Sequence, residues 1–355
     1  MNLVKMGLTD KVLRDFNTGK TSDDLIIGRV ALEHKRMYRV WTEQGELLCE
    51  VSGKLSFLAH TREDFPAVGD WVSLKPRFDE GRGTINAVLP RKSKFSRKTA
   101  GDTTTEQIVA ANVDTVFLVN SLNEDLNLRR IERYLLLTWE SGANPVIVLS
   151  KADLCQDIPG RLADVEAIAY GGVPVIPISS ETNSGFEKLE EFLLPGKTVA
   201  LLGSSGVGKS TITNRLLGEE RQLVQEIRED DAKGRHTTTH RELIILPNGS
   251  ILIDTPGMRE LQLWESSEGL METFSEIEEL VTRCRFRDCQ HKNEPGCAVV
   301  KAIEEGVVEA DRLHSYNKLL KELAFIERKA NKRAQSEERK QWRQINKQMK
   351  QRKGC

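Results

Sequence analysis

A glycine-rich stretch that ends in lysine and serine carries the clearest chemistry of the sequence. Residues 199–202 are apolar, and the pattern G-x-x-x-x-G-K-S follows them as Gly203, Ser204, Ser205, Gly206, Val207, Gly208, Lys209 and Ser210. Glycines let the backbone curve around an anion, and the first N–H groups of the helix expected from Thr211 point at phosphate oxygens. Lys209 is expected to reach the β- and γ-phosphates, and the Ser210 hydroxyl to ligate Mg²⁺. The stretch therefore predicts a nucleoside triphosphate site.

Two further segments supply groups for the γ-phosphate and for Mg²⁺. An apolar run ends at Asp254 and continues as D-T-P-G to Gly257. The carboxylate can hold Mg²⁺ through water, and the Gly257 N–H can contact the γ-phosphate. Upstream, residues 234–240 read GRHTTTH, and one of these threonines can complete the Mg²⁺ shell as part of a switch loop. We favour Thr238, although the run of three threonines leaves the choice open and a plain surface loop is the alternative.

A third segment offers recognition of the base. The motif S-K-x-D follows an apolar run and consists of Ser150, Lys151, Ala152 and Asp153. The Asp153 carboxylate can accept hydrogen bonds from N1–H and N2–H₂ of guanine, while the aliphatic stem of Lys151 lies along the ring. Adenine would leave this carboxylate unpaired, which is costly. Ser179 and Ser180 end a later apolar run and can offer backbone N–H groups to guanine O6.

A cluster of cysteines and one histidine indicates a metal site. The pattern C-x4-C-x-H-x5-C comprises Cys284, Cys289, His291 and Cys297. Three thiolates and one imidazole complete a tetrahedral zinc shell without an open position, so we expect a structural zinc rather than a catalytic one. Four basic residues surround these ligands, which would let the module dock on RNA as well; they are Arg283, Arg285, Arg287 and Lys292.

The elements that position these motifs fall into four parts. About five short strands between Leu25 and Leu89 favour a small closed barrel of the OB type, which serves either to bind RNA or as a spacer. Apolar strands then alternate with helices, which predicts a doubly wound α/β domain with a mostly parallel sheet. The pattern is helical after Leu261. The expected division is a poorly ordered N-terminal arm at 1–24, the barrel at 25–98, the nucleotide-binding α/β domain at 99–262 and a zinc-binding helical domain at 263–355.

Two basic segments suggest contact with nucleic acid. Residues 91–98 carry five Lys and Arg with one Phe, and they could lie on a phosphate backbone or form a solvated linker. The tail from Lys318 to Lys353 carries thirteen Lys and Arg against four Glu. The tail is either a solvated helix or an arm that contacts RNA, and its charge excess favours RNA.

Composition bounds the class of protein. The chain has 355 residues, of which 39% are hydrophobic and 30% charged, and its formal net charge is −1. No apolar run approaches the roughly 18–20 residues that a membrane span requires, and the N-terminus has no apolar signal core. We therefore expect a cytoplasmic protein of two or three domains that has no membrane partner.

The order of the nucleotide motifs is informative. In ordinary small GTPases the phosphate loop comes first, whereas here the base motif precedes the phosphate loop, the threonine segment and D-T-P-G. A sheet whose original chain termini lie close together can begin and end elsewhere in the sequence without losing its packing. With the barrel and the cysteine cluster, this order resembles the RsgA family, also called YjeQ, of circularly permuted bacterial GTPases. The resemblance covers roughly Leu25 to Lys329.

The resemblance implies a GTPase that is stimulated by the small ribosomal subunit and acts late in its maturation. It implies bound GTP or GDP with Mg²⁺, one structural Zn²⁺, ribosomal RNA as the partner and a monomeric chain. One departure concerns the guanine motif, which usually begins with Asn. Ser150 stands there instead and removes one side-chain contact, so guanine preference is expected from Asp153 while the effect on affinity stays open.

Hydrolysis needs a group that positions water. Many GTPases place Gln after D-x-x-G, but Met258 occupies that position and cannot orient a water molecule. His236 lies in the threonine segment, and imidazole can orient or partly deprotonate water near neutral pH. The resemblance also implies a catalytic role for His236, and an ordinary surface histidine is the alternative.

Three other functions fit parts of the sequence. One is a permuted GTPase that serves the large ribosomal subunit, and another is an RNA-binding module whose nucleotide only gates its affinity. A P-loop kinase is disfavoured by the guanine motif at Ser150–Asp153.

Overall fold

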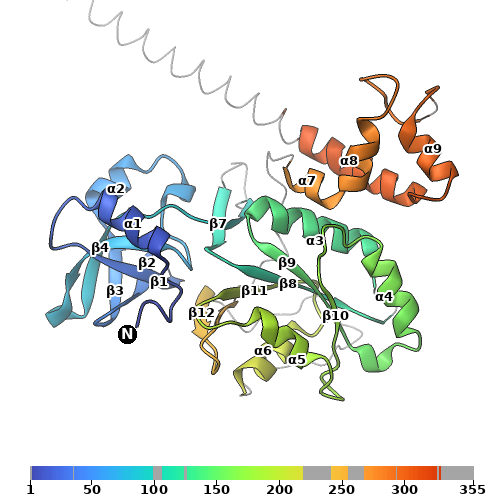
Figure 1. The fold of residues 1–355 in the computed structure, drawn as a ribbon. Coiled ribbons are helices and arrows are strands. Elements are labelled where there is room, and N and C mark those ends of the chain that lie inside the picture. Colours follow the sequence, from blue (N-terminus) through green and yellow to red (C-terminus); the bar gives the residue numbers. More distant parts are fainter. Residues whose placement is uncertain are drawn as a thin grey trace, which may run out of the picture. The chain divides into compact units, whose positions relative to one another are not determined.

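The chain divides into two compact units, Met1–Gln262 and Leu263–Cys355. The computed structural model describes residues 2–34, 36–98, 106–123, 126–218, 241–254, 268–292, 294–325 and 328. The first unit holds the strands and most of the longer helices (Figure 1). The second unit is helical in its described part.

Five strands near the N-terminus close into a barrel in the order β1–β2–β3–β5–β4, with β4 pairing back onto β1. The pairs are antiparallel except for β3 with β5. The strands are β1 (Ile26–His34), β2 (Met37–Thr42), β3 (Gly45–Val51), β4 (Trp71–Arg77) and β5 (Arg82–Val88), and the short helices between them are α2 (Gly53–Leu58), η1 (Arg62–Asp64) and η2 (Phe78–Glu80). Alternate side chains such as Val30, Val40 and Leu74 fill the interior. The predicted barrel is confirmed.

Six strands of the α/β part follow in the order β10–β9–β8–β11–β13–β12. All neighbours are parallel except β12 with β13. The strands are β8 (Thr115–Ser121), β9 (Asn144–Ser150), β10 (Val175–Pro177), β11 (Thr198–Leu202), β12 (Arg241–Ile245) and β13 (Ile251–Asp254). The helices are α3 (Leu128–Ser141), η3 (Ala152–Leu154), α4 (Ile158–Glu166), α5 (Phe186–Leu189), η4 (Glu190–Phe192) and α6 (Lys209–Leu217). Because α3 and α6 cover opposite faces of the sheet, the predicted doubly wound, mostly parallel arrangement is confirmed (Figure 1).

One sheet runs through both parts of the first unit. Strand β12 pairs with β13 on one side and, antiparallel, with barrel strand β1 on the other, so that Leu32 faces Glu242. Strand β1 changes partner along its length, because Ile26–Arg29 pair with β4 and only its end reaches β12. The result is a continuous sheet of eleven strands.

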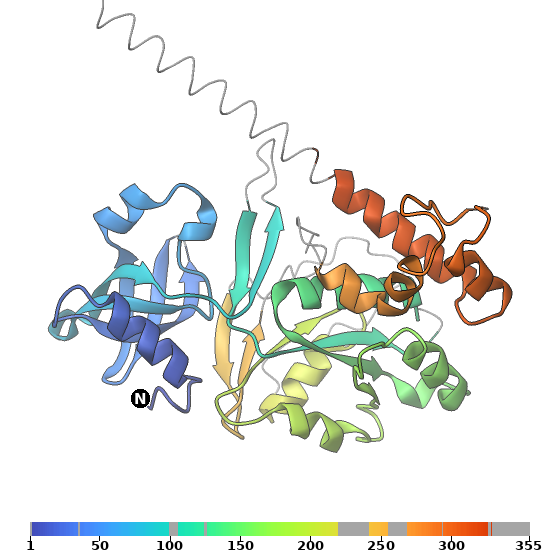
Figure 2. The same cartoon turned by 45° about the horizontal axis from the view of Figure 1, so that its top comes forward.

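A two-stranded hairpin lies where the sequence suggested a domain boundary at residue 98. Strand β6 (Lys94–Lys98) pairs with β7 (Glu106–Ala111) and with no barrel strand (Figure 2). The residues on the two sides of that boundary therefore belong to one hairpin.

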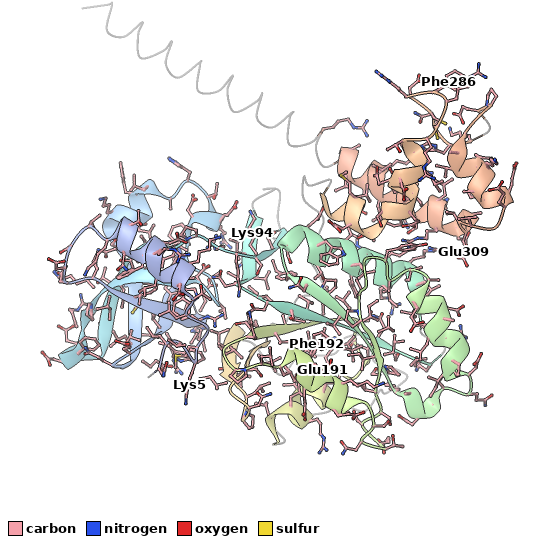
Figure 3. All side chains as sticks on the ribbon, in the orientation of Figure 1. Lys5, Lys94, Glu191, Phe192, Phe286 and Glu309 are labelled. Carbon is pink, nitrogen blue, oxygen red and sulfur yellow. The ribbon has the colours of Figure 1, made fainter. Side chains whose placement is uncertain are left out.

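The basic segment at 91–98 is tied into the fold by ion pairs. The Arg91 guanidinium donates two hydrogen bonds to the Asp70 carboxylate, at 2.8 and 2.7 Å. Lys94, marked in Figure 3, lies 2.5 Å from a carboxylate oxygen of Glu63. Residues 94–98 form strand β6 rather than a linker, and the charges of Arg91 and Lys94 are paired within the unit.

The N-terminal arm is anchored, so the prediction of poor order is wrong. Helix α1 (Asp10–Gly19) begins where the Thr9 hydroxyl accepts a hydrogen bond from the Val12 N–H at 3.4 Å. Leu3 and Met6 are 4% and 5% exposed. Gly7 has φ of +88°, and a Cβ there would lie 2.5 Å from the Gly196 carbonyl oxygen. Single buried side chains and a close backbone approach leave no periodic pattern for sequence reasoning to detect.

A buried arginine joins the arm, the barrel and the α/β sheet. Arg29 of β1 donates to the Met6 carbonyl at 2.5 Å and to the Thr198 hydroxyl at 2.7 Å, and its guanidinium lies 5.4 Å from the centroid of the Trp71 ring. Burial lowers the pKa of Arg29 to about 10, although Asp114 and Asp70 act in the opposite direction. The three parts therefore meet at one desolvated charge.

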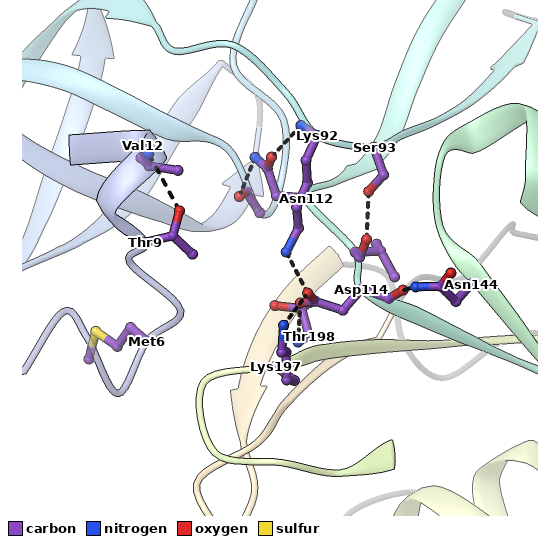
Figure 4. Close-up of polar contacts among 12 residues, drawn as sticks. Met6, Thr9, Val12, Lys92, Ser93, Asn112, Asp114, Asn144, Lys197 and Thr198 are labelled. Atoms are coloured by element: carbon purple, nitrogen blue, oxygen red, sulfur yellow. Dashed lines mark hydrogen bonds and ion pairs between the residues drawn. The ribbon is translucent and has the colours of Figure 1, made fainter. Parts of the chain in front are cut away.

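Asp114 is the acidic centre on the α/β side of this junction (Figure 4). Its carboxylate lies 2.7 Å from the Lys92 ammonium and 3.2 Å from the Lys197 ammonium, and it accepts the Thr198 N–H at 2.9 Å. Burial acts to raise the pKa of Asp114, but the two lysines and the Thr198 N–H outweigh it and hold that pKa below its usual range.

The second unit has a small core around three short helices. They are α7 (Glu268–Thr273), α8 (Ser275–Val281) and α9 (Ala298–Glu304), and residues 310–325 continue in helical conformation. Arg312 is buried, pairs with Glu276 and donates to the Thr273 carbonyl at 2.7 Å. Its guanidinium lies 4.7 Å from the centroid of the Phe274 ring. Most of the predicted basic tail, Lys318–Lys353, lies outside the described residues.

Among the helices of the described residues, none combines the length and the apolar character that crossing a bilayer requires.

Asp114→Asn is expected to destabilise the first unit in a pH-dependent manner. Because the folded pKa of Asp114 is depressed, its stabilisation is present above the unfolded pKa and is lost as pH falls through the folded pKa. We expect the substitution to lower the free energy of unfolding by about 1–2 kcal/mol at neutral pH, and we expect this difference to shrink below about pH 4. Urea unfolding of both proteins across this range measures it, and an equal difference at pH 7 and pH 3 would contradict the role of the charge.

Candidate functional site

The predicted nucleotide motifs meet at one edge of the sheet. Strands β9, β8, β11 and β13 are successive parallel neighbours, so their carboxyl ends point the same way. The base motif follows β9, the phosphate loop follows β11, and β13 ends at Asp254. Open α/β sheets bind ligands at this edge. The structure thus brings together segments that stand in reversed order along the chain.

The phosphate loop is shaped by three glycines. A Cβ on Gly203 would lie 2.3 Å from the Val119 carbonyl oxygen of β8, so this position tolerates no side chain. Gly206 and Gly208 have φ of +76° and +90°, values that other residues rarely adopt. Helix α6 begins directly after this turn, at Lys209. The loop therefore directs its backbone N–H groups and a helix N-terminus to one side.

Lys209 folds back over the loop. Its ammonium donates to the Gly203 carbonyl at 2.7 Å and to the Ser204 carbonyl at 2.5 Å. Ser210 and Thr211 are half-buried on the first turn of α6, whereas Ser205 is exposed. The lysine charge is thus held at the loop.

The base motif is held by the loop that follows β10. Lys151 adopts a left-handed backbone, with φ of +58°, and the Ala152 N–H donates to the Ile178 carbonyl at 3.0 Å. The Ser179 hydroxyl donates to the Asp153 carboxylate at 2.5 Å. That serine is 1% exposed, whereas Asp153 and Ser180 are exposed. An otherwise accessible carboxylate is therefore held in one orientation by a buried hydroxyl.

The loop carrying Ser179 is closed on itself. Ser179 and Ser184 exchange two backbone hydrogen bonds of 3.1 Å, and the Ser179 hydroxyl also accepts the Thr182 N–H at 3.1 Å. Sequence reasoning missed Thr182 and Ser184, and it missed Val119 as the close neighbour of the phosphate loop. Residue types carry no signal for the contact of Gly203 with Val119, because it depends on how β8 and β11 lie side by side, whereas the bonds of Thr182 and Ser184 are local to one loop.

Ser150 touches the phosphate loop directly. Its hydroxyl donates to the Val207 carbonyl at 2.6 Å, and the side chain is 4% exposed. The base-side and phosphate-side segments are therefore in contact in the folded chain.

The predicted switch residues lie at or beyond the limits of the described residues. His236, Thr238 and Gly257 lie outside the described residues. The backbone of Asp254 ends β13, next to β11, but its side chain is not described.

The predicted cysteine and histidine ligands converge in the second unit. The ligand atoms of Cys284, Cys289, His291 and Cys297 all lie within 4.8 Å of one another. The sulfur atoms of Cys284 and Cys297 are 3.9 Å apart, and His291 Nδ1 lies 3.6 and 3.5 Å from them. A tetrahedral zinc with bonds of about 2.3 Å to sulfur and about 2.0 Å to nitrogen sets the S···S edge at about 3.8 Å and the S···N edge at about 3.5 Å. The separations among Cys284, His291 and Cys297 therefore fit a single tetrahedral ion, and Cys289 lies within reach of the same ion.

Backbone N–H groups favour the thiolate form of Cys284, one of the four predicted ligands. Burial acts to raise the pKa of Cys284, but the backbone N–H groups of Ala298 and Val299 outweigh it and lower that pKa, which favours the thiolate that binds metals. On the same loop, the Arg285 guanidinium lies 5.5 Å from the centroid of the Phe286 ring, and Phe286 is 41% exposed (Figure 3).

Two family models match the chain. The model described as RsgA GTPase matches residues 88–264. A model described as ABC transporter matches residues 187–351, a range that contains the phosphate loop but not Ser150–Asp153. The RsgA GTPase match contains both the phosphate loop and Ser150–Asp153.

Curated relatives align over most of the chain. Small ribosomal subunit biogenesis GTPase RsgA 2 of Lactiplantibacillus plantarum is 48% identical over 92% of this chain and 90% of its own length. Small ribosomal subunit biogenesis GTPase RsgA of Methanosarcina acetivorans is 46% identical over 90% of this chain and 85% of its own.

Two solved structures share the arrangement. YjeQ from Thermotoga maritima matches with a TM-score of 0.63 and 29% identity, covering 84% of this chain and 99% of that one. YloQ, described as a circularly permuted GTPase, matches with a TM-score of 0.61 and 25% identity over 86% of this chain and 96% of its own.

Gly203→Ala is expected to disrupt the phosphate loop through steric overlap with β8. The added methyl group would overlap the Val119 carbonyl, which costs about 1–3 kcal/mol and shifts the loop. Thermal unfolding and nucleotide titration measure the two effects. Gly19→Ala is the matched control, because a Cβ at Gly19 meets nothing within 4 Å. Equal behaviour of the two variants would contradict this account of the loop.

Proposed function

The chain belongs to the RsgA family of GTPases, and we propose that it hydrolyses GTP to GDP and phosphate during late maturation of the small ribosomal subunit. The observation that carries this proposal is the order of the strands. The loop with Asp153 follows β9 and the loop with Lys209 follows β11, and these strands are the two neighbours of β8. Both loops therefore leave the sheet at its carboxyl end. The two motifs can therefore hold opposite ends of one nucleotide although their chain order is reversed. We propose the small subunit as the partner because the relatives are named small ribosomal subunit biogenesis GTPases.

Guanine selectivity is assigned to Asp153. Its carboxylate accepts the N1–H and N2–H₂ donors of guanine, and the Ser179 bond holds it in position for them. The Lys151 stem lies along the base, and the Ser180 N–H faces guanine O6. Adenine lacks the amino donor, so it leaves part of the carboxylate unpaired.

The phosphates and Mg²⁺ are assigned to the loop after β11 and to the two switch segments. When the nucleotide binds, the Lys209 ammonium exchanges its hydrogen bonds to the Gly203 and Ser204 carbonyls for bonds to the β- and γ-phosphates. The backbone N–H groups of the loop surround these phosphates. Ser210 and Thr238 would ligate Mg²⁺, and Asp254 would hold it through water. Gly257 contacts the γ-phosphate through its N–H.

His236 is assigned to position the attacking water. Because Met258 replaces the usual glutamine, the chain needs another group for this task, and the His236 imidazole of the threonine segment is our candidate. Contact with the small subunit would order this segment, which fits a reaction that depends mainly on positioning and charge stabilisation.

The partner is the small subunit and its ribosomal RNA, contacted through the barrel, the metal module and the basic tail. We place the protein in the cytoplasm, where subunits mature, as a monomer. The metal of the second unit is assigned as one structural Zn²⁺, because three thiolates and an imidazole leave no coordination position open.

GTP turnover with purified ribosomal subunits tests the function. We expect strong stimulation by small subunits, and His236→Ala should lower the stimulated rate by about 100-fold while GTP affinity stays unchanged. His314→Ala, which changes an exposed histidine of the second unit, is the control. Stimulation by large subunits alone would reassign the partner. Unstimulated turnover that His236→Ala leaves intact would favour a nucleotide-gated RNA-binding module.

Cys297→Ser is expected to release the zinc and loosen the second unit, because metal binding and folding are coupled in small metal modules. Elemental analysis of the purified protein should find one zinc per chain in the wild type and less than a tenth of that in the variant. Limited proteolysis should then cut the second unit while the first still binds GDP. Cys155→Ser, outside the cluster, is the control. A wild-type chain purified without zinc would refute the assignment.

A further inference from the structure

We propose that an unpaired base of single-stranded RNA stacks on Phe57, while Lys54 contacts a neighbouring phosphate. Both residues belong to α2, the short helix that follows the third barrel strand (Figure 1). The inference rests on the proposed function, since it assigns a contact to the proposed RNA partner. OB barrels commonly bind nucleic acid on the face of their second and third strands and on the adjoining loops. A contact through the helix would be an additional one.

Helix α2 is fixed to the barrel by its inward side. The Ser52 hydroxyl accepts the Leu55 N–H at 3.1 Å where the helix begins, and the Ser52 N–H donates to the Ile85 carbonyl of β5 at 2.8 Å. Leu55 is half-buried and packs against the barrel core. The apolar contact of the helix with the barrel is therefore made by Leu55 and not by Phe57.

Phe57 lies on the outward side of the helix. It is 86% exposed, and Leu58 beside it is 55% exposed. Lys54, which is also exposed, precedes Phe57 by three residues, and this spacing places two side chains on one face of a helix. A ring and a cation on the same face suit single-stranded nucleic acid, because a base stacks on the ring and a phosphate pairs with the cation.

The surroundings of this ring carry positive charge. Residues 51–61 contain no Asp or Glu, whereas Lys54 and then Arg62 are exposed cations. The two acidic residues that follow are already engaged. Glu63 pairs with a lysine of β6 at 2.5 Å, and the Asp64 carboxylate accepts two backbone N–H groups at 2.8 Å. These surroundings attract a phosphate backbone, which favours RNA over a basic protein segment as the partner.

Phe78 provides a contrast within the same barrel. It is 39% exposed and belongs to η2, where Asp79 and Glu80 follow it directly. Both acidic residues are exposed, and Arg77 pairs with Glu80 at 3.1 Å. Because carboxylates repel phosphate, this ring is poorly placed for RNA. Of these two phenyl rings, the one on α2 stands in the positive environment.

Substitutions of Phe57 test the stacking contact in the full-length chain. The probe is a fluorescent single-stranded RNA of about 12 nucleotides in about 0.3 M KCl, which weakens contacts made to phosphate alone. Phe57→Ala should lower its affinity about 5- to 30-fold, as for one stacked base, and Phe57→Trp should retain it. Phe57→Leu keeps an apolar side chain without an aromatic face, so it should lose as much as Phe57→Ala. Wild-type affinity in Phe57→Ala or Phe57→Leu would overturn the stacking.

Phe78→Ala is the matched control, because it removes an exposed ring of the same type from the same barrel. It should leave RNA affinity within about twofold of wild type. Thermal unfolding of Phe57→Ala should coincide with that of the wild type, since the ring is exposed. An equal loss of affinity in Phe78→Ala and Phe57→Ala would overturn the proposal.

Lys54→Gln tests the phosphate contact. One phosphate contact on a single strand contributes about 0.7 to the slope of log affinity against log salt concentration, and we expect the slope to fall by this amount. An unchanged slope would overturn the assignment of Lys54.

These measurements use RNA binding alone, so their outcome is separate from that of the turnover assay. Turnover without stimulation by small subunits, together with the expected effects at Phe57, would count against the proposed function only. Stimulated turnover together with wild-type RNA binding by Phe57→Ala would count against this inference only.

Discussion

The pairing of β12 with β1 is the constraint on which the first unit depends. Strand β12 would be the edge of the α/β sheet, and an unpaired edge exposes a row of backbone N–H and C=O groups. Here a barrel strand covers it, with Leu32 opposite Glu242 and Glu33 opposite Arg241. Strand β12 is thus held on both sides, by β1 and by β13. It begins directly after the threonine segment that is proposed to sense the γ-phosphate, so the barrel fixes one end of that segment.

The polar cluster beside this pairing specifies how the barrel docks. Arg29 is buried against Met6, Thr198 and Trp71, and Asp70 is buried against Arg91. Buried charges are a weak source of net stability, because their desolvation offsets much of their attraction. Their geometry is demanding, however. A shifted barrel would leave these groups desolvated and unpaired, so alternative arrangements are disfavoured more strongly than the observed one is favoured.

Sequence reasoning located the strands and the motifs but not the contacts between them. The apolar run at 199–202 placed β11 to within one residue, and the five barrel strands lie within the expected range from Leu25 to Leu89. The arm was misjudged, and the β6–β7 hairpin was missed, because the arm is held by single side chains and the hairpin segment reads as a basic linker. Within the site, motif spacing named Asp153 and Lys209. The bonds of Ser179 to Asp153 and of Ser150 to Val207 are long-range, so only the strand order reveals them.

The reversed motif order changes connectivity without changing the chemistry. Parallel strands bring their carboxyl ends to the same edge whatever their order along the chain, so a nucleotide meets the same groups as in an unpermuted GTPase. What differs is where the segment after Asp254 leads, because the phosphate loop, the threonine segment and D-T-P-G keep their relative order. The threonine segment runs into β12, which is paired with the barrel, and the segment after Asp254 runs into the second unit, which begins at Leu263. Each segment proposed to sense the γ-phosphate is therefore attached to a different RNA-binding candidate.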